Sequence, residues 1–275
     1  MDELKKNRIV TTFAELRREG KKALLPFLTA GYPDGDATEA LLREFERRGV
    51  RMCELGFPFS DPVADGPVIQ ASYTRALAAG LKVGDIFHLA AGYRKGGGEM
   101  ALAAMVSYSI IFRHGVESFL RDASVAGFDG LIIPDLPVEE AGELTALAGQ
   151  DGLANIPLAA PTTSPARRQL IARQARGFIY YISVAGITGQ RDRLPEATLA
   201  AVAELRAQTD TPVCVGFGIS NPATVAQVCQ VADGAIVGSA IVHRLTEDLE
   251  QHIPRAQLVR RAGDFVELLL SPLKA

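Results

Sequence analysis

Short apolar segments alternate with helical patterns along the whole chain, and this alternation limits the possible folds more than any other feature. Segments such as 131–133 are apolar on both faces, as buried strands of a parallel sheet are. Eight segments of this kind are predicted to be strands: 24–29, 50–55, 101–107, 130–134, 155–160, 178–183, 212–216 and 234–238. Helices are predicted between them at about 37–48, 68–79, 116–126, 138–149, 166–175, 196–208 and 222–231.

Eight strand–helix units in about 250 residues predict an α/β fold of the closed (β/α)8 type, the TIM barrel. A doubly wound open sheet is the alternative. We favour the barrel because an eighth strand completes the count and because no GxGxxG motif follows the first strand. Extra helices are predicted at 8–19, 82–95 and 255–270, and the first of them could close the bottom of the barrel. No linker or low-complexity segment interrupts the chain, so residues 1–275 are expected to form a single barrel domain.

The composition argues against several kinds of partner. A net charge of −3 does not favour binding to nucleic acid. No apolar run reaches the roughly 18 residues that a membrane-spanning helix needs, and residues 1–6 lack the apolar core of a signal peptide. We therefore expect a cytoplasmic protein that binds neither nucleic acid nor membranes.

Residues 54–67 combine three acids with three prolines and two glycines, which makes this segment the most unusual in the chain. Proline and glycine disfavour helix and regular strand here, so a shaped loop is predicted. Glu54 lies within the second predicted strand, where a carboxylate is costly to bury unless something binds or uses it. An acid at a strand end, followed by a rigid loop carrying Asp61 and Asp65, suits general acid–base chemistry on a neutral substrate.

The last two predicted strands lead into small, glycine-containing loops at 216–220 and 238–241, each just before a helical pattern. Glycine lets backbone N–H groups approach a phosphate closely, and the N-terminus of a helix favours an anion. The loops after the seventh and eighth strands are also the usual phosphate site of a TIM barrel. Tight turns are the simpler explanation for either loop alone, but the pair favours a phosphate site that residues 186–189 could help to close.

Two common types of aldolase are disfavoured by residues that are missing from the strand ends. No lysine falls at the C-terminal end of a predicted strand, which argues against a Schiff-base enzyme. The four histidines, His88, His114, His243 and His252, lack the spacing of metal ligands. No basic side chain is expected at the barrel mouth. Carboxylate acid–base catalysis on a phosphorylated substrate, without metal or cofactor in this chain, is the prediction that remains.

The sequence resembles the α subunit of tryptophan synthase. The resemblance is carried by the loop at 54–67 and by the segments 134–140, 180–183, 185–189, 216–220 and 237–242, in the order of that family and over nearly the full length. It implies retro-aldol cleavage of indole-3-glycerol phosphate to indole and glyceraldehyde 3-phosphate. It also implies that Glu54 moves protons to indole C3 and from the glycerol hydroxyl, while Asp65 binds the indole N–H. Asp61 is assigned a turn or partner contact instead.

The resemblance further implies which residues hold the substrate, although barrel packing is the competing explanation for the apolar ones. The substrate-binding residues are expected to be Phe27, Met105, Ile132, Tyr180, Thr188, Phe217 and Ile236. The phosphate-binding residues are expected to be Gly189, Gly218, Gly238 and Ser239. Two departures from the family pattern are the segment 107–110, where many relatives carry Tyr-Tyr-Asn-Pro, and Val184, where some carry arginine.

The family works as an α2β2 tetramer, so the resemblance implies a tryptophan synthase β subunit as partner. That subunit carries pyridoxal phosphate and makes L-tryptophan from indole and L-serine, and the loop at 56–67 would lie at the shared face. Other functions stay open: a free-standing lyase that releases indole, an activator of a β subunit without catalysis, or an isomerase of phosphorylated compounds on the same scaffold. An activator would not need both Glu54 and Asp65, which favours the enzyme.

Overall fold

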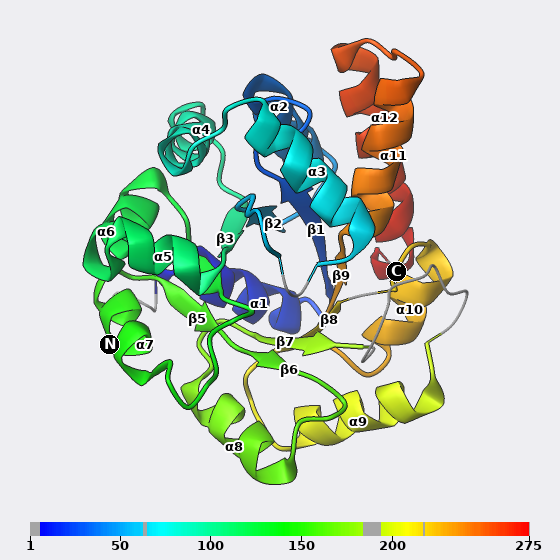
Figure 1. The fold of residues 1–275 in the computed structure, drawn as a ribbon. Coiled ribbons are helices and arrows are strands. Elements are labelled where there is room, and N and C mark those ends of the chain that lie inside the picture. The colour runs from blue at the N-terminus through cyan, green and yellow to red at the C-terminus, as the bar shows by residue number, and fades with distance from the viewer. Residues whose placement is uncertain (1–5, 63–64, 184–193, 217, 275) are drawn as a thin grey trace.

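The computed structural model describes residues 6–62, 65–183, 194–216 and 218–274, and its strands form a ring that the helices surround (Figure 1). All the pairings are parallel, and the order in the sheet is β5-β4-β3-β2-β1-β9-β8-β7-β6. The predicted barrel is therefore confirmed, and the alternative of a doubly wound open sheet is wrong. Its strands are β1 (Ala23–Thr29), β2 (Met52–Gly56), β3 (Ala101–Met105), β4 (Gly130–Ile132), β5 (Ala154–Ile156), β6 (Leu158–Ala159), β7 (Ile179–Ile182), β8 (Val213–Gly216) and β9 (Gly234–Val237).

The fifth predicted strand is divided in two by Pro157. Proline has no N–H to give to a neighbouring strand, so the ladder is interrupted there. β5 pairs with β4 on one side of the break, and β6 pairs with β7 on the other. The two pieces thus join the ends of the sheet and complete the barrel, and the last three predicted strands become β7, β8 and β9.

The helices follow the predicted alternation, with two exceptions. The seven-residue helix α5 was not predicted, and no range was predicted for the helix after the last strand, which is α11. None of the helices in the described part of the chain is long and apolar enough to cross a membrane. The helices are α1 (Arg8–Arg18), α2 (Gly35–Arg47), α3 (Pro67–Ala78), α4 (Val83–Lys95), α5 (Tyr108–His114), α6 (Val116–Ala126), α7 (Gly142–Gln150), α8 (Pro165–Gln174), α9 (Glu196–Ala207), α10 (Pro222–Cys229), α11 (Ser239–Glu250) and α12 (Arg255–Leu270).

Helix α1 closes the bottom of the barrel, as its amphipathic pattern predicts (Figure 1). Asn7 caps the helix, because its side-chain oxygen accepts hydrogen bonds from two backbone N–H groups of the first turn. The same side chain donates to the backbone oxygens of Asp129, at 2.6 Å, and Gly152, at 2.7 Å. These two residues precede β4 and β5, so the N-terminal ends of the strands are covered. The opposite end of the ring, where the strands finish, is left for a site.

Candidate active site

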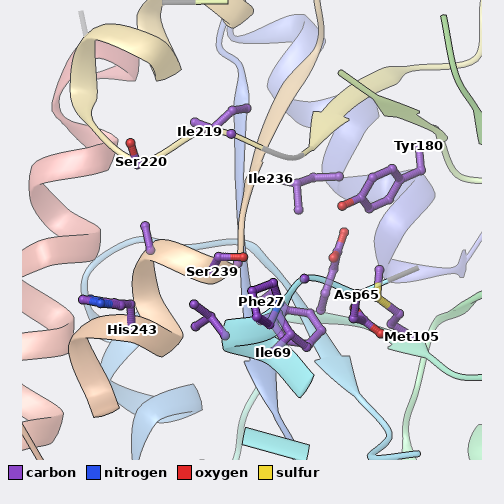
Figure 2. Close-up of a pocket in the computed structure, with 17 residues that line it drawn as sticks. Phe27, Asp65, Ile69, Met105, Tyr180, Ile219, Ser220, Ile236, Ser239 and His243 are labelled. Carbon is purple, nitrogen blue, oxygen red and sulfur yellow. The ribbon is translucent and has the colours of Figure 1, made fainter. Parts of the chain in front are cut away.

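The C-terminal ends of the strands surround a cavity of about 340 Å³ (Figure 2). Side chains reach it from β1, β2, β3, β7 and β9, from the start of α3, and from the residues after β8 and β9. Tyr180, Asp65 and Met105 lie at one end, and Ser220 and His243 lie at the other (Figure 2). The cavity therefore has an acidic and apolar end and an end formed by loops and the first turns of helices.

Glu54 is completely buried in the wall of this cavity. It stands on β2 in register with Phe27 of β1 and Ala103 of β3, and neither neighbour offers its carboxyl group a polar partner. Both carboxyl oxygens lack a hydrogen bond among the residues that the structure describes. Burial raises the pKa of Glu54 well above its ordinary value, and the negative charge of Asp65 raises it further. Glu54 therefore keeps its proton to a higher pH than an ordinary glutamate does, which suits a group that gives a proton.

Asp129 is a second buried acid, and its hydrogen bonds show how a carboxylate with a structural role is stabilised in this fold. Asp129, at the bottom of the barrel, is 4% exposed. It accepts hydrogen bonds from Arg8 at 3.0 Å, from Arg94 at 2.9 Å and from the backbone N–H of Leu102 at 2.9 Å. Buried polar groups in native proteins are normally satisfied in this way. Glu54 has no such partner within the part of the chain that the structure describes, and this difference from Asp129 points to a role in chemistry.

Asp65 stands immediately before α3, on the loop rather than on a strand. Gly66 caps the helix and Pro67 is its first residue, a position where proline is well tolerated. The side-chain amide of Gln70 donates to the backbone oxygen of Asp65 at 2.8 Å, which fixes the local turn. Burial raises the pKa of Asp65 to about 6. Asp65 is therefore ionised above about pH 6, and it stands beside a glutamate whose pKa is raised by burial and by the charge of Asp65 itself.

The walls around the two acids are apolar, and two glycines make room for their aromatic side chains. Phe27, Met105, Tyr180 and Ile236 line the cavity. A Cβ atom at Gly216 would collide with the hydroxyl of Tyr180, and one at Gly56 would collide with the ring of Phe27. Ile132, also predicted to contact substrate, is completely buried in register with Met105 and does not reach the cavity surface.

At the other end, the cavity is lined by Gly218, Gly238 and Ser239. Gly218 has a φ of +77°, and a Cβ atom there would meet nothing within 4 Å, so the backbone is exposed on that side. Ser239 is the first residue of α11 and Gly238 is its N-cap. Free backbone N–H groups and the helix dipole make such an end favourable for an anion.

Thr188, Gly189 and Phe217, which complete the predicted set, lie outside the described residues. Several lining residues were missed by the sequence analysis, and His243 corrects the expectation that no basic side chain reaches the barrel mouth. It lies four residues after Ser239, hence on the same face of α11, and this helical spacing is the signal that could have identified it. Val68 and Ile69 were missed as well, whereas Gly66, Pro67, Ile219, Ser220 and Ala240 lie in loops that the sequence analysis assigned to the site without naming them individually.

A smaller side cavity of about 140 Å³ adjoins the first and shares Asp65 and Met105 with it. Its far wall is formed by the segment at 107–110, which departs from the family pattern. There Asp135 accepts hydrogen bonds from the hydroxyl of Ser107 at 2.6 Å and from the backbone N–H of Tyr108 at 2.8 Å. These bonds fix the start of α5, so Asp135 has a structural role. Within the described residues, no group of His, Cys, Asp and Glu side chains could hold a metal ion.

Comparisons with known proteins agree with this geometry. A family model described as tryptophan synthase alpha chain matches residues 13–266. The tryptophan synthase alpha chain of Rhodopirellula baltica is 45% identical over 270 residues, covering 96% of this chain and 97% of its own. That of Geobacter sulfurreducens is 46% identical over 263 residues, with 96% and 97% covered.

Solved structures are similar over the same extent. The α subunit from Legionella pneumophila has a TM-score of 0.89 and 35% identity, with 98% of each chain covered. A chain from the tryptophan synthase α2β2 complex of Pyrococcus furiosus has a TM-score of 0.81 and 34% identity, with 91% of this chain and 99% of that chain covered.

Proposed function

The chain belongs to the tryptophan synthase alpha chain family, and we propose that Glu54 and Asp65 carry out the reaction of that family at the barrel mouth. The enzyme is a lyase that cleaves indole-3-glycerol phosphate to indole and glyceraldehyde 3-phosphate. The observation that carries the assignment is the carboxyl group of Glu54, which is completely buried and lacks a partner among the described residues. The direct test is release of indole by the purified chain supplied with indole-3-glycerol phosphate.

The chemistry explains why a protonated acid and a carboxylate are both needed. Indole is a poor leaving group until C3 is protonated, and the proton comes from Glu54, whose raised pKa keeps it available. Protonation creates an indolenine cation. Asp65, ionised above about pH 6, accepts a hydrogen bond from the indole N–H and stabilises the positive charge.

The second half of the reaction returns the proton. The carboxylate of Glu54 takes the proton of the hydroxyl on the glycerol carbon bonded to C3. The bond between that carbon and C3 breaks, its electron pair neutralises the indolenine, and the carbon becomes the aldehyde of glyceraldehyde 3-phosphate. Glu54 ends protonated, as it began, so the cycle needs no other acid. The apolar walls formed by Phe27, Tyr180 and Ile236 hold the indole ring and exclude water from the cation.

Phosphate is held, in this proposal, by backbone N–H groups of Gly189, Gly218, Gly238 and Ser239. The exposed backbone at Gly218 and the start of α11 support this assignment. Asp65 lies at one end of the cavity and Ser220 and His243 lie at the other, so the glycerol chain of the substrate would lie between them (Figure 2). Apart from His243, no basic side chain among the described residues lines the cavity, so the phosphate depends mainly on backbone groups.

Replacement of Gly218 by valine is expected to weaken substrate binding by at least tenfold, because the side chain occupies the space through which the phosphate approaches. Gly152 provides a matched control, since its φ is +74° and its Cβ position is also open, but it lies before β5 at the barrel bottom. Both valine variants should lose about 1–3 kcal/mol of stability from the strained backbone. Calorimetric titration with glycerol 3-phosphate measures the difference, and equal affinity in both variants would contradict the assignment.

A β subunit carrying pyridoxal phosphate is the proposed partner, in an α2β2 assembly, and the cytoplasm is the proposed location. The family supports the partner, and the α2β2 complex of the Pyrococcus furiosus relative supports the stoichiometry. The three free, buried cysteines, Cys53, Cys214 and Cys229, suit a reducing compartment. The loop ending at Asp65 is the part of the site that such a partner would contact.

We expect the isolated chain to be a slow lyase that a β subunit accelerates. Asp65 stands on a loop, and a displacement of about 1 Å in a catalytic group can cost on the order of 10²-fold. A partner that binds the catalytic arrangement of this loop more tightly shifts the population towards it. Steady-state indole formation at increasing concentrations of β subunit is the measurement. Full activity without a partner would favour a free-standing lyase, and none in either condition would favour a non-catalytic activator.

A further inference from the structure

Tyr73, on α3, has a buried phenol that neither the sequence analysis nor the mechanism above uses. The residue is 3% exposed and lines the side cavity together with Asp65. The hydroxyl lies 2.7 Å from the position that a Cβ atom at Gly56 would take, so glycine is needed there to admit it. Buried polar atoms normally have a hydrogen-bond partner. We therefore expect the hydroxyl of Tyr73 to have a partner in or beside the side cavity.

The position of Gly56 places this hydroxyl relative to the two acids. Glu54 and Gly56 are two residues apart on β2, so both face the barrel interior, about 6.6 Å apart along the strand. The phenol of Tyr73 thus stands above Glu54, on the side of the barrel mouth. Asp65 lines the same side cavity as Tyr73 and belongs to the turn that begins the same helix.

Helix α3 is firmly held in this position. The hydroxyl of Ser72 lies 2.6 Å from that of Thr29 on β1, and it donates to the backbone oxygen of Ile69 at 2.7 Å. These bonds hold the neighbouring residue Tyr73 against β2, where its hydroxyl lies beside Gly56. Because burial, Asp65 and Glu54 all raise the pKa of Tyr73 well above its ordinary value, the phenol keeps its hydrogen and acts as a donor.

We propose that Tyr73 is a positioning residue: when substrate is bound, its phenolic hydroxyl donates a hydrogen bond to one oxygen of the Asp65 carboxylate and leaves the other oxygen for the indole N–H. This inference rests on the proposed function. A carboxylate accepts through both oxygens, and a donor on one of them stabilises the ionised form and fixes its orientation. The hydrogen bond then holds the loop carboxylate of Asp65 where the indolenine charge develops.

Replacement of Tyr73 by phenylalanine tests this, because it keeps the ring and removes only the donor. We expect kcat for indole formation to fall roughly tenfold with little change in KM, which matches the loss of one hydrogen bond to a charged group. The acid limb of the pH profile of kcat/KM should move to higher pH, since loss of the donor raises the pKa of Asp65 further. Tyr181→Phe is the matched control: its hydroxyl, on β7, is buried without a partner among the described residues and lies outside the cavity.

The groups that face Asp65 from the surrounding elements are unchanged in Tyr73→Phe, so a shift of the acid limb reports the missing hydroxyl. These groups are Glu54 on β2 and Tyr180 on β7, with Asp61 and Asp135 across the side cavity, while His243 on α11 lies at the other end of the main cavity. A profile like that of the unmodified protein, or a uniform loss with an unmoved acid limb, would overturn the inference. Indole release by the unmodified protein tests the proposed function separately, so the two failures can be distinguished.

Discussion

Replacement of Glu54 by glutamine is expected to lower the rate of indole formation by about 10²–10⁴-fold, the usual contribution of a positioned acid–base group. Glutamine keeps the size and polarity of the side chain but can neither give a proton to C3 nor take one from the glycerol hydroxyl. Binding of glycerol 3-phosphate should be unchanged, because Glu54 stands on β2, whereas the proposed phosphate-binding groups follow β8 and β9. Single-turnover measurement of indole separates the loss of chemistry from slow product release. Turnover like that of the unmodified protein would eliminate Glu54 as the proton carrier.

Glu54 also makes the stability of the unmodified protein depend on pH, with a sign that follows from its burial. The folded-state pKa of Glu54 is raised above its ordinary value, so the folded protein binds the proton more tightly than the unfolded chain does. Its contribution to stability is fully present below about pH 4.3 and is lost as the pH rises towards the folded-state pKa. Glu54→Gln lacks this dependence. Its free energy of unfolding, relative to the unmodified protein, should therefore increase with pH, as urea denaturation at several pH values would show.

Replacement of Asp65 by asparagine is the second change with a large expected effect, a loss of about 10²–10³-fold in turnover. Asparagine can still accept the hydrogen bond from the indole N–H, but it carries no negative charge to stabilise the indolenine cation. Calorimetry should show that glycerol 3-phosphate still binds, since Gly218, Gly238 and Ser239 belong to other loops. If phosphate affinity were lost together with activity, the assignment of separate roles to the two ends would be wrong.

Asp61→Asn is the matched control for Asp65→Asn, because it removes a carboxylate from the same loop. Asp61 is exposed, and its side chain accepts a hydrogen bond from Ser60 at 2.8 Å, as expected for a residue that shapes the turn. The variant should cleave indole-3-glycerol phosphate at a near-normal rate in the absence of a partner. An equal loss in both variants would mean that the total charge of the loop matters, and not the position of Asp65.

The barrel could be predicted from the sequence because its strands are buried on both faces and read as apolar runs. The pattern is less informative where one residue changes the backbone. Pro157 lies inside a run that otherwise predicts one strand, and only the pairing partners of β5 and β6 show that the run is divided. Helix α5 has seven residues, too few to show a helical period, and it depends on the bonds from its first residues to Asp135.

The acids of the site were predictable for a different reason. Glu54 is a charged residue in an apolar strand, and Asp65 ends a loop with an unusual density of proline and glycine. Both residues therefore differ from what their neighbours in the sequence would predict. Tyr73 and His243 do not: a tyrosine on the buried face of a helix and a histidine in a helix fit ordinary packing. Their places beside the cavity follow from how α3 and α11 dock on the barrel, which depends on contacts between segments far apart in the chain.

The two ends of the cavity belong to different sets of strands, and this bears on how such a barrel can evolve. The acids stand on β2 and on the loop before α3, whereas Gly218, Gly238 and Ser239 follow β8 and β9. A phosphate site made of backbone groups does not depend on side-chain identity. It also does not select the chemical group to which the phosphate is attached. Substitutions around β2 can therefore change which bond is broken while the anchor persists. The phosphate anchor and the two acids can therefore change independently of each other.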